Sequence, residues 1–126
     1  MAIDVRSMIL VVDDEEALAS VIAGVLEDEG HTVQVVHDGA SALTRMREDP
    51  RPCLAFLDLM MPGITGWDVR RAMLADPTLS AIPVAIVSAF VVGEVAELQP
   101  AAVVQKPFSL DRIVEIAQSH CGPPPL

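Results

Sequence analysis

The sequence predicts an α/β fold in which a parallel five-stranded sheet carries helices on both faces. Two observations support this prediction. Short aliphatic segments that suit buried strands alternate with segments in which apolar residues recur at helical spacing. Polar residues directly follow the aliphatic segments, as expected where the carboxyl ends of parallel strands form a site. Right-handed crossovers would then give a doubly wound, three-layer α/β/α arrangement.

Five segments are predicted to be strands. Each is short and mainly aliphatic, as expected for strands that are covered on both faces. In chain order they are Met8–Val12, Thr32–Val36, Cys53–Leu57, Pro83–Val87 and Ala101–Val104. The fourth lies within residues 77–93, an uncharged stretch of 17 residues that is close to the minimum for a membrane-spanning helix. Its prolines and serines favour a buried strand flanked by loops.

Helical patterns occupy the segments between these strands. The first contains Leu18 to Leu26 at helical spacing and stops at Gly30, and the second is predicted over Gly39–Glu48. A third includes Val69 and Met73 and ends before Asp76-Pro77, where the residue before proline disfavours helix. Only a weak helical pattern covers Phe90–Gln99, and a final helix is expected after Ser109 as N-cap.

Length and composition limit the class of protein. A chain of 126 residues suits a single domain, with a core over residues 8–121 and a proline-rich tail over 122–126. The formal net charge of −10 argues against a nucleic-acid-binding surface, which needs clustered cations. The N-terminus lacks the pattern of a signal peptide, so a cytoplasmic protein with no membrane segment is expected.

Some residues are predicted to take no part in the chemistry. Cys53 and Cys121 show no metal-ligating spacing and are expected to be reduced thiols of a cytosolic protein. Arg70 and Arg71 are expected on exposed helix faces. His37 shows no ligand spacing and is expected to be solvated or structural.

The residues that follow the strands point to phosphoryl chemistry. Asp13, Asp14, Asp58, Ser88 and Lys106, which is the only lysine, would meet at one edge of the sheet. Three carboxylates placed together repel one another unless one is protonated or a cation compensates. Oxygen ligands suit Mg²⁺, with Mn²⁺ as an alternative, and this set of residues contains no cysteine or histidine, which argues against zinc. A nucleophilic carboxylate, a hydroxyl and two cations are what phosphoryl transfer to aspartate requires.

These residues resemble the receiver domain of bacterial response regulators. The resemblance rests on Asp13-Asp14, Asp58 with Met-Met-Pro-Gly after it, Ser88 and Lys106-Pro107-Phe108, and it spans residues 8–121. The intervals of 44 residues from Asp14 to Asp58 and 30 from Asp58 to Ser88 are typical of that family. The resemblance implies a flavodoxin-like fold with strand order 2-1-3-4-5.

The resemblance also implies the chemistry of the site. Asp58 would accept a phosphoryl group from the phosphohistidine of a histidine kinase or a histidine phosphotransfer protein. Mg²⁺ would be held by Asp13, Asp14, Asp58 and the backbone carbonyl of Met60. Ser88 and Lys106 would bind the phosphoryl oxygens and act as the switch. The domain would catalyse its own phosphorylation and slow autodephosphorylation, without being a turnover enzyme, and would signal to an unknown output partner or fused output domain.

Three further residues have structural roles in this resemblance. Pro62 belongs to the loop that follows Asp58, and Gly66 is expected to let the chain turn tightly into the third helix. The Lys106–Pro107 bond is expected to be cis, which proline permits at low energetic cost.

The sequence departs from the family pattern on the face that normally carries output. Val103 occupies a position where receivers usually have tyrosine or phenylalanine, and the segment from Ser88 to Lys106 is a few residues short. The alternative function is therefore a receiver-like protein-interaction module that signals without phosphorylation. Met60 and Phe90 are apolar where a polar side chain would orient a hydrolytic water, which favours a long-lived aspartyl phosphate.

Enzymes of related fold fit the sequence less well. A flavodoxin-type protein needs a Ser/Thr/Gly-rich phosphate loop after the first strand, and an acidic Asp-Asp-Glu-Glu segment stands there instead. A phosphatase with an aspartate nucleophile would have a carboxylate in place of Met60. No nucleotide-binding GxxxxGK[ST] motif is present.

Overall fold

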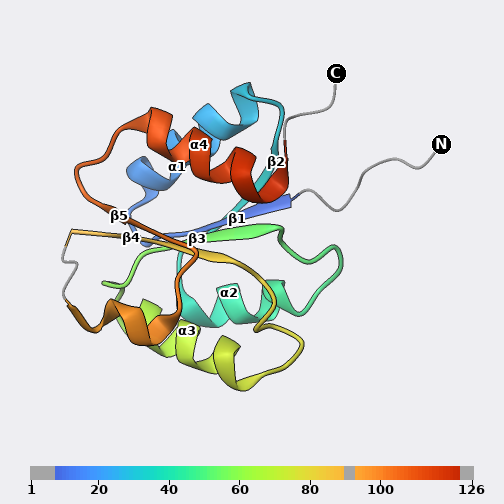
Figure 1. Cartoon of the computed structure of the whole chain (residues 1–126), viewed down its shortest axis with the longest axis vertical. Helices are drawn as coiled ribbons and strands as arrows, with labels where there is room; N and C mark the ends of the chain where they lie inside the picture. The colour runs from blue at the N-terminus through green and yellow to red at the C-terminus, as the bar shows by residue number, and fades with distance from the viewer. Residues whose placement is uncertain (1–7, 90–92, 123–126) are drawn as a thin grey trace.

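A central parallel sheet lies between two layers of helices in the computed structural model, which describes residues 8–89 and 93–122 (Figure 1). The sheet order is β2-β1-β3-β4-β5, so the predicted fold class and strand order are confirmed. The strands are β1 (Met8–Val12), β2 (Thr32–Val36), β3 (Leu54–Leu57), β4 (Val84–Ser88) and β5 (Ala102–Gln105). The last three differ by one residue from the predicted boundaries.

Among the described residues, three α-helices and one 3-10 helix connect the strands, and a fourth α-helix follows β5. They are α1 (Glu16–Asp28), α2 (Gly39–Met46), α3 (Gly66–Ala75), η1 (Gly93–Leu98) and α4 (Leu110–Cys121). Helices α1 and α4 cover one face of the sheet, and α2 and α3 cover the other (Figure 1). The weak helical pattern over Phe90–Gln99 corresponds in part to η1, while residues 90–92 lie outside the described residues.

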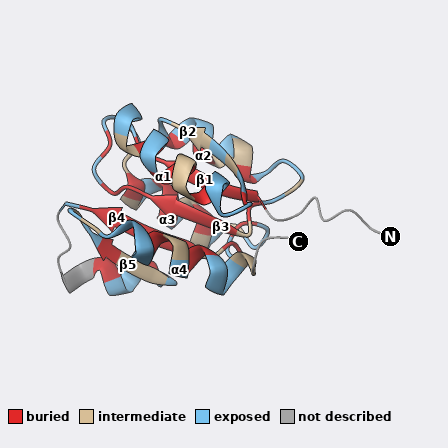
Figure 2. Ribbon diagram, turned by 90° about the horizontal axis from the view of Figure 1, so that it is seen from above, coloured by how far each residue is buried: buried red, intermediate tan, exposed pale blue. Residues whose placement is uncertain are grey.

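The burial pattern explains why the central strands read as continuous apolar runs. Every residue of β1, β3 and β4 is buried, and Figure 2 shows these strands as the buried centre of the molecule. Two hydrophobic clusters lie on opposite faces, one including Leu10, Leu57 and Met73, the other including Val11, Phe56 and Ile113. Successive strand residues therefore point into different cores. The stretch 77–93 contains β4, as predicted, and no helix of the described chain is long and apolar enough to cross a membrane.

The starts of α2, α3 and α4 are fixed by side chains that satisfy otherwise unpaired backbone N–H groups. Ser109 accepts a hydrogen bond from the Asp111 N–H, which confirms its predicted role as N-cap. Thr65 and Asp68 form a reciprocal capping box at α3. The start of the helix that follows the Asp58 loop is thus defined by local chemistry.

The expectation of two reduced cysteines is wrong, because Cys53 and Cys121 form a disulfide. Cys53 immediately precedes β3, and Cys121 is the last residue of α4. Helix α4 runs across the sheet and ends on the side where β3 begins. Their Cα atoms are 5.5 Å apart, within the range for a disulfide. The two residues are 68 positions apart in the sequence, so no local spacing pattern reveals the pairing.

The expectation of an exposed Arg70 is also wrong. Its side chain is buried, and its Nε and Nη2 donate to the carbonyl oxygens of Leu98 and Gln99 at 2.7 and 3.0 Å. These carbonyls belong to the end of η1, and Gln99 has a φ of 49°. The Arg70 side chain, which belongs to α3, therefore donates hydrogen bonds to the backbone carbonyl groups at the end of the segment between β4 and β5. Arg71 is exposed as predicted and lies over the Trp67 ring.

Candidate functional site

The carboxyl edge of the sheet brings together the side chains that the sequence singled out. The Asp58 N–H donates to the Val12 carbonyl at 3.0 Å, and the Lys106 N–H donates to the Ser88 carbonyl at 2.9 Å. The Asp13 N–H likewise donates to the Val36 carbonyl. These bonds extend the parallel ladders one residue past the strands, so each site residue starts from a rigid part of the backbone.

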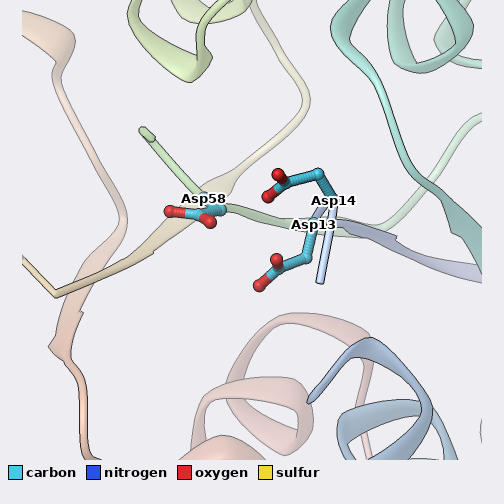
Figure 3. A group of neighbouring side chains, drawn as sticks. All are labelled: Asp13, Asp14 and Asp58. Carbon is cyan, nitrogen blue, oxygen red and sulfur yellow. The ribbon is translucent and has the colours of Figure 1, made fainter. Parts of the chain in front are cut away.

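Three carboxylates form a cluster at this edge. One oxygen from each of Asp13, Asp14 and Asp58 lies within 4.8 Å of the others. Figure 3 shows the three side chains directing their carboxylates toward the same side. Asp13 and Asp58 are buried, whereas Asp14 is exposed. The cluster therefore has two desolvated carboxylates and one that faces solvent.

Lys106 provides the positive charge of the site. Its Nζ lies 3.2 Å from Asp13 Oδ2 and 3.4 Å from Asp58 Oδ2, with Glu15 Oε1 further away at 4.0 Å. Burial alone would lower the pKa of the ammonium, but the charges of Asp58 and Asp13 outweigh that effect and raise the pKa above its ordinary value. Lys106 is therefore a fixed cation that bridges two buried carboxylates.

Asp58 lies in an environment that disfavours the charged form of its carboxyl group. Burial raises the pKa of its carboxyl group, and the nearby charge of Asp13 raises it further. A hydrogen bond from the Met60 N–H to Asp58 Oδ1, at 3.1 Å, and the contact with Lys106 act in the opposite direction. Burial and the like charge prevail, so the ionised form of Asp58 calls for more positive charge than Lys106 supplies.

The donor set fits a hard divalent cation. All three ligating groups are carboxylates, and the exposed position of Asp14 leaves one side of the cluster open to water. Mg²⁺ binds through one or two carboxylates and retains several waters, which matches a cluster of this form. One ammonium opposes three carboxylates here, so the charge balance also favours a bound cation.

The remaining predicted site residues lie around this cluster. Ser88 is fully buried as the last residue of β4, and the Lys106–Pro107 bond is cis as predicted. Met60 has a side chain that is 57% exposed, and Pro62 is exposed in the same loop. Val103 is half-buried against the hydrophobic cluster on the α2 and α3 face.

Gly66 is required for a reason that differs from the predicted one. Its φ is not positive, so the chain does not need glycine for a left-handed turn. A Cβ atom at this position would lie 2.2 Å from the Asp58 carbonyl oxygen and 2.6 Å from the Leu59 Cα. The start of α3 therefore packs directly on the backbone that carries Asp58, and only glycine permits that approach.

Two neighbours of the cluster were not predicted to belong to it. His37 Nδ1 lies 2.9 Å from the Asp13 carbonyl oxygen, and Glu15 N–H donates to Asp13 Oδ1 at 2.9 Å. His37 directly follows β2, so the rule that selected the other strand-end residues would also have selected this one. Both contacts help to fix the position of Asp13.

An apolar groove of about 560 Å³ adjoins Lys106. It is lined by α1, through Leu18 and Val21, and by the segment from Lys106 to Leu110. Val21 is 50% exposed and Leu110 is 39% exposed. The groove therefore places accessible apolar side chains beside Lys106.

The similar proteins found by sequence and by structure include response regulators. The sequence model described as response regulator receiver domain matches residues 9–118. Over 84 residues, or 67% of the chain, the sequence is 46% identical to the DNA-binding response regulator MtrA of Mycolicibacterium smegmatis. The chain spans about a third of that relative, since the match covers 35% of its length.

Solved structures of two response regulators share the fold of this chain, with similar sequence identities and TM-scores. The Mn²⁺-bound form of response regulator Rcp1 is 25% identical, with a TM-score of 0.75 over 90% of each chain. The phosphorylated cyanobacterial phytochrome response regulator RcpA is 27% identical, with a TM-score of 0.76 over 90% of this chain and 89% of that one. The candidate site thus occupies a fold for which metal-bound and phosphorylated relatives are known.

Replacing Asp58 by asparagine is expected to stabilise the metal-free protein at neutral pH. Because the pKa of Asp58 is higher in the folded chain than in the unfolded chain, ionisation lowers stability as pH rises between those two values. At pH 7 with a chelator, Asp58→Asn should raise the midpoint of thermal unfolding by roughly 3–6 °C. The difference should shrink toward pH 4, near the ordinary carboxyl pKa. Glu48→Gln, at an exposed position, is the control, and an unchanged or lower midpoint for Asp58→Asn contradicts this account.

Replacing Gly66 by alanine should destabilise the protein by about 1–3 kcal/mol, since the added methyl group overlaps backbone atoms. Urea unfolding measures this loss. Gly24→Ala in α1 is the matched control, because a Cβ there meets nothing within 4 Å and alanine favours helix by up to about 1 kcal/mol. Equal stability of the two variants would show that α3 does not pack on the Asp58 backbone.

Proposed function

The chain belongs to the response regulator receiver family, and from this premise we propose that it is the phospho-acceptor domain of a two-component phosphorelay. Asp58 receives the phosphoryl group from the phosphohistidine of a histidine kinase or a histidine phosphotransfer protein. The observation that carries the proposal is the buried Asp58 carboxylate, clustered with Asp13 and Asp14 and 3.4 Å from the Lys106 ammonium.

In the proposed reaction, a carboxylate oxygen of Asp58 forms the new bond to phosphorus while the bond from phosphorus to the histidine nitrogen breaks. The Met60 N–H, bound to Asp58 Oδ1, holds the carboxylate in a fixed orientation. Lys106 and the hydroxyl of Ser88 bind the phosphoryl oxygens, and Lys106 neutralises their developing charge. Formation of the bond turns a partly compensated carboxylate into a larger dianion, so Lys106 and Ser88 change partners and report the change.

Asp13, Asp14, Asp58 and the backbone carbonyl of Met60 are proposed to hold Mg²⁺, with Mn²⁺ as a substitute. The bound ion supplies positive charge that offsets the charges of the carboxylates and of the incoming phosphoryl group. The three clustered carboxylates support this proposal, as does the Mn²⁺-bound form of Rcp1. His37 and the Glu15 N–H, which contact Asp13, would keep that ligand in place.

The partners are inferred from the surroundings of the site and from the longer relatives. The apolar groove beside Lys106 suits contact with the protein that carries the phosphohistidine, because its accessible side chains adjoin the site.

Relatives such as MtrA are described as DNA-binding and are longer than this chain, so the output is assigned to a fused output domain or a separate partner. The net charge of −10 makes nucleic-acid contact through residues 1–126 unfavourable. A domain that serves such a relay would act in the cytoplasm.

The second candidate function is a receiver-like module that binds a partner without phosphorylation. It is favoured by Val103, which packs in an aliphatic cluster where receivers usually carry an aromatic side chain. The short segment between Ser88 and Lys106, which contains the 3-10 helix η1, also favours it. In that case the site would hold a cation and take no phosphoryl group.

Phosphorylation is tested most simply by intact mass. The protein is incubated with Mg²⁺ and an acyl phosphate, and wild-type protein is expected to gain one phosphoryl group. Asp58→Asn removes the acceptor oxygen, so this variant should gain none. A chelator should abolish the adduct because the carboxylates then remain uncompensated.

Asp28→Asn, at the exposed end of α1, is the control and should be phosphorylated like the wild type. Absence of an adduct from wild-type protein under all donors would favour the phosphorylation-independent module. Following the adduct after removal of the donor tests the slow loss expected from the apolar Met60. Rapid loss in Mg²⁺ without a phosphatase would contradict that expectation; Phe90, the other residue on which it rests, lies outside the described residues.

A further inference from the structure

The disulfide between Cys53 and Cys121 has no role in the proposed phosphoryl chemistry. Cys53 precedes β3, whose far end carries Asp58, and Cys121 ends α4, which begins four residues after Lys106. The Lys106–Asp58 contact and the disulfide therefore join the same two segments at opposite ends of the sheet. In Figure 1 the last turn of α4 lies at the end of the sheet where β1 begins.

We propose that Cys53 and Cys121 form a reversible thiol–disulfide exchange site, whose co-reactants are low-molecular-weight thiols and disulfides. The inference rests in part on the proposed function, because that function places the chain in the cytoplasm. Low-molecular-weight thiols keep most cysteines reduced in that compartment. Disulfides in that compartment are usually transient or redox-sensing. Both cysteines are only half-buried, so a small thiol has access to them.

The exchange is balanced with respect to atoms and electrons. An external thiolate attacks one sulfur, the Cys53–Cys121 bond breaks, and a mixed disulfide and one protein thiolate are formed. A second external thiolate attacks the mixed disulfide and releases the other protein thiolate with one low-molecular-weight disulfide. The protein gains two electrons and, after protonation, two hydrogens, while two external thiols are oxidised. A low-molecular-weight disulfide drives the reverse reaction.

Exchange makes or breaks the covalent link between the end of α4 and the residue before β3. It leaves the phosphorylation site in place. The buried side chains of Ile113, Ile116 and Ala117 anchor the middle of α4 on the sheet in either state. Beyond them the chain is exposed from Gln118 to His120, and the disulfide is the covalent tie for that turn. Reduction therefore frees the last turn and restores entropy to an unfolded chain that was cross-linked over 68 positions.

Equilibration of the folded protein in mixtures of glutathione and glutathione disulfide tests the proposal, with free thiols alkylated and counted by intact mass. The count is expected to move between zero and two, reversibly, as the mixture changes. The reduced protein should unfold at a midpoint lower by about 10 °C. Amide hydrogen exchange at residues 118–122 should be at least about tenfold faster than in the oxidised protein, with α1 unchanged.

A double variant, Cys53→Ala with Cys121→Ala, is the control and should show a midpoint that does not respond to thiols. Two outcomes overturn the proposal: thiols that never pair in excess disulfide, or a disulfide that resists glutathione until urea is added. Both redox forms should accept the phosphoryl group from an acyl phosphate equally. Failure of phosphorylation in both forms, with exchange intact, would refute the proposed function and not this inference.

Discussion

The contact of one ammonium group with two buried carboxylates is the interaction on which the rest of the site depends. Lys106 Nζ joins Asp13 and Asp58, which arise from different strands and would otherwise repel one another in a desolvated position. The attraction is incomplete, since burial and Asp13 still raise the pKa of Asp58. The carboxylates of the site therefore carry more negative charge than Lys106 offsets, which is the basis for the proposed binding of a divalent cation.

The architecture that makes this contact possible follows from patterns visible in the sequence. Buried parallel strands appear in the sequence as continuous aliphatic runs, and the residues that follow them must meet at one edge of the sheet. This rule groups Asp13, Asp58, Ser88 and Lys106 from the sequence alone. The observed boundaries of β3, β4 and β5 differ from the predicted boundaries by only one residue. The order of the strands, however, came from the family resemblance, because alternation of strands and helices alone does not determine it.

Other features depend on contacts between distant segments and leave no local trace. The disulfide joins positions 68 residues apart, and Arg70 is buried because the end of η1 presents two carbonyl groups to α3. The need for Gly66 was foreseen, but its cause is close packing against the Asp58 backbone and not a turn. In each case the deciding partner becomes adjacent only after the chain has folded. His37 differs, since its place directly after β2 was available to the same reasoning that found the other residues.

The central claim is that the carboxylate cluster carries more negative charge than Lys106 offsets, so that a divalent cation binds beside the ammonium. Calorimetric titration with Mg²⁺ tests it directly in wild-type protein, Asp13→Asn and Lys106→Met. Wild-type protein should bind one ion per chain, and Asp13→Asn should bind at least about tenfold more weakly because a ligand charge is lost. Lys106→Met should bind more tightly than wild type, since no ammonium then offsets part of the carboxylate charge. Equal affinity in all three proteins, or weaker binding by Lys106→Met, would contradict the account.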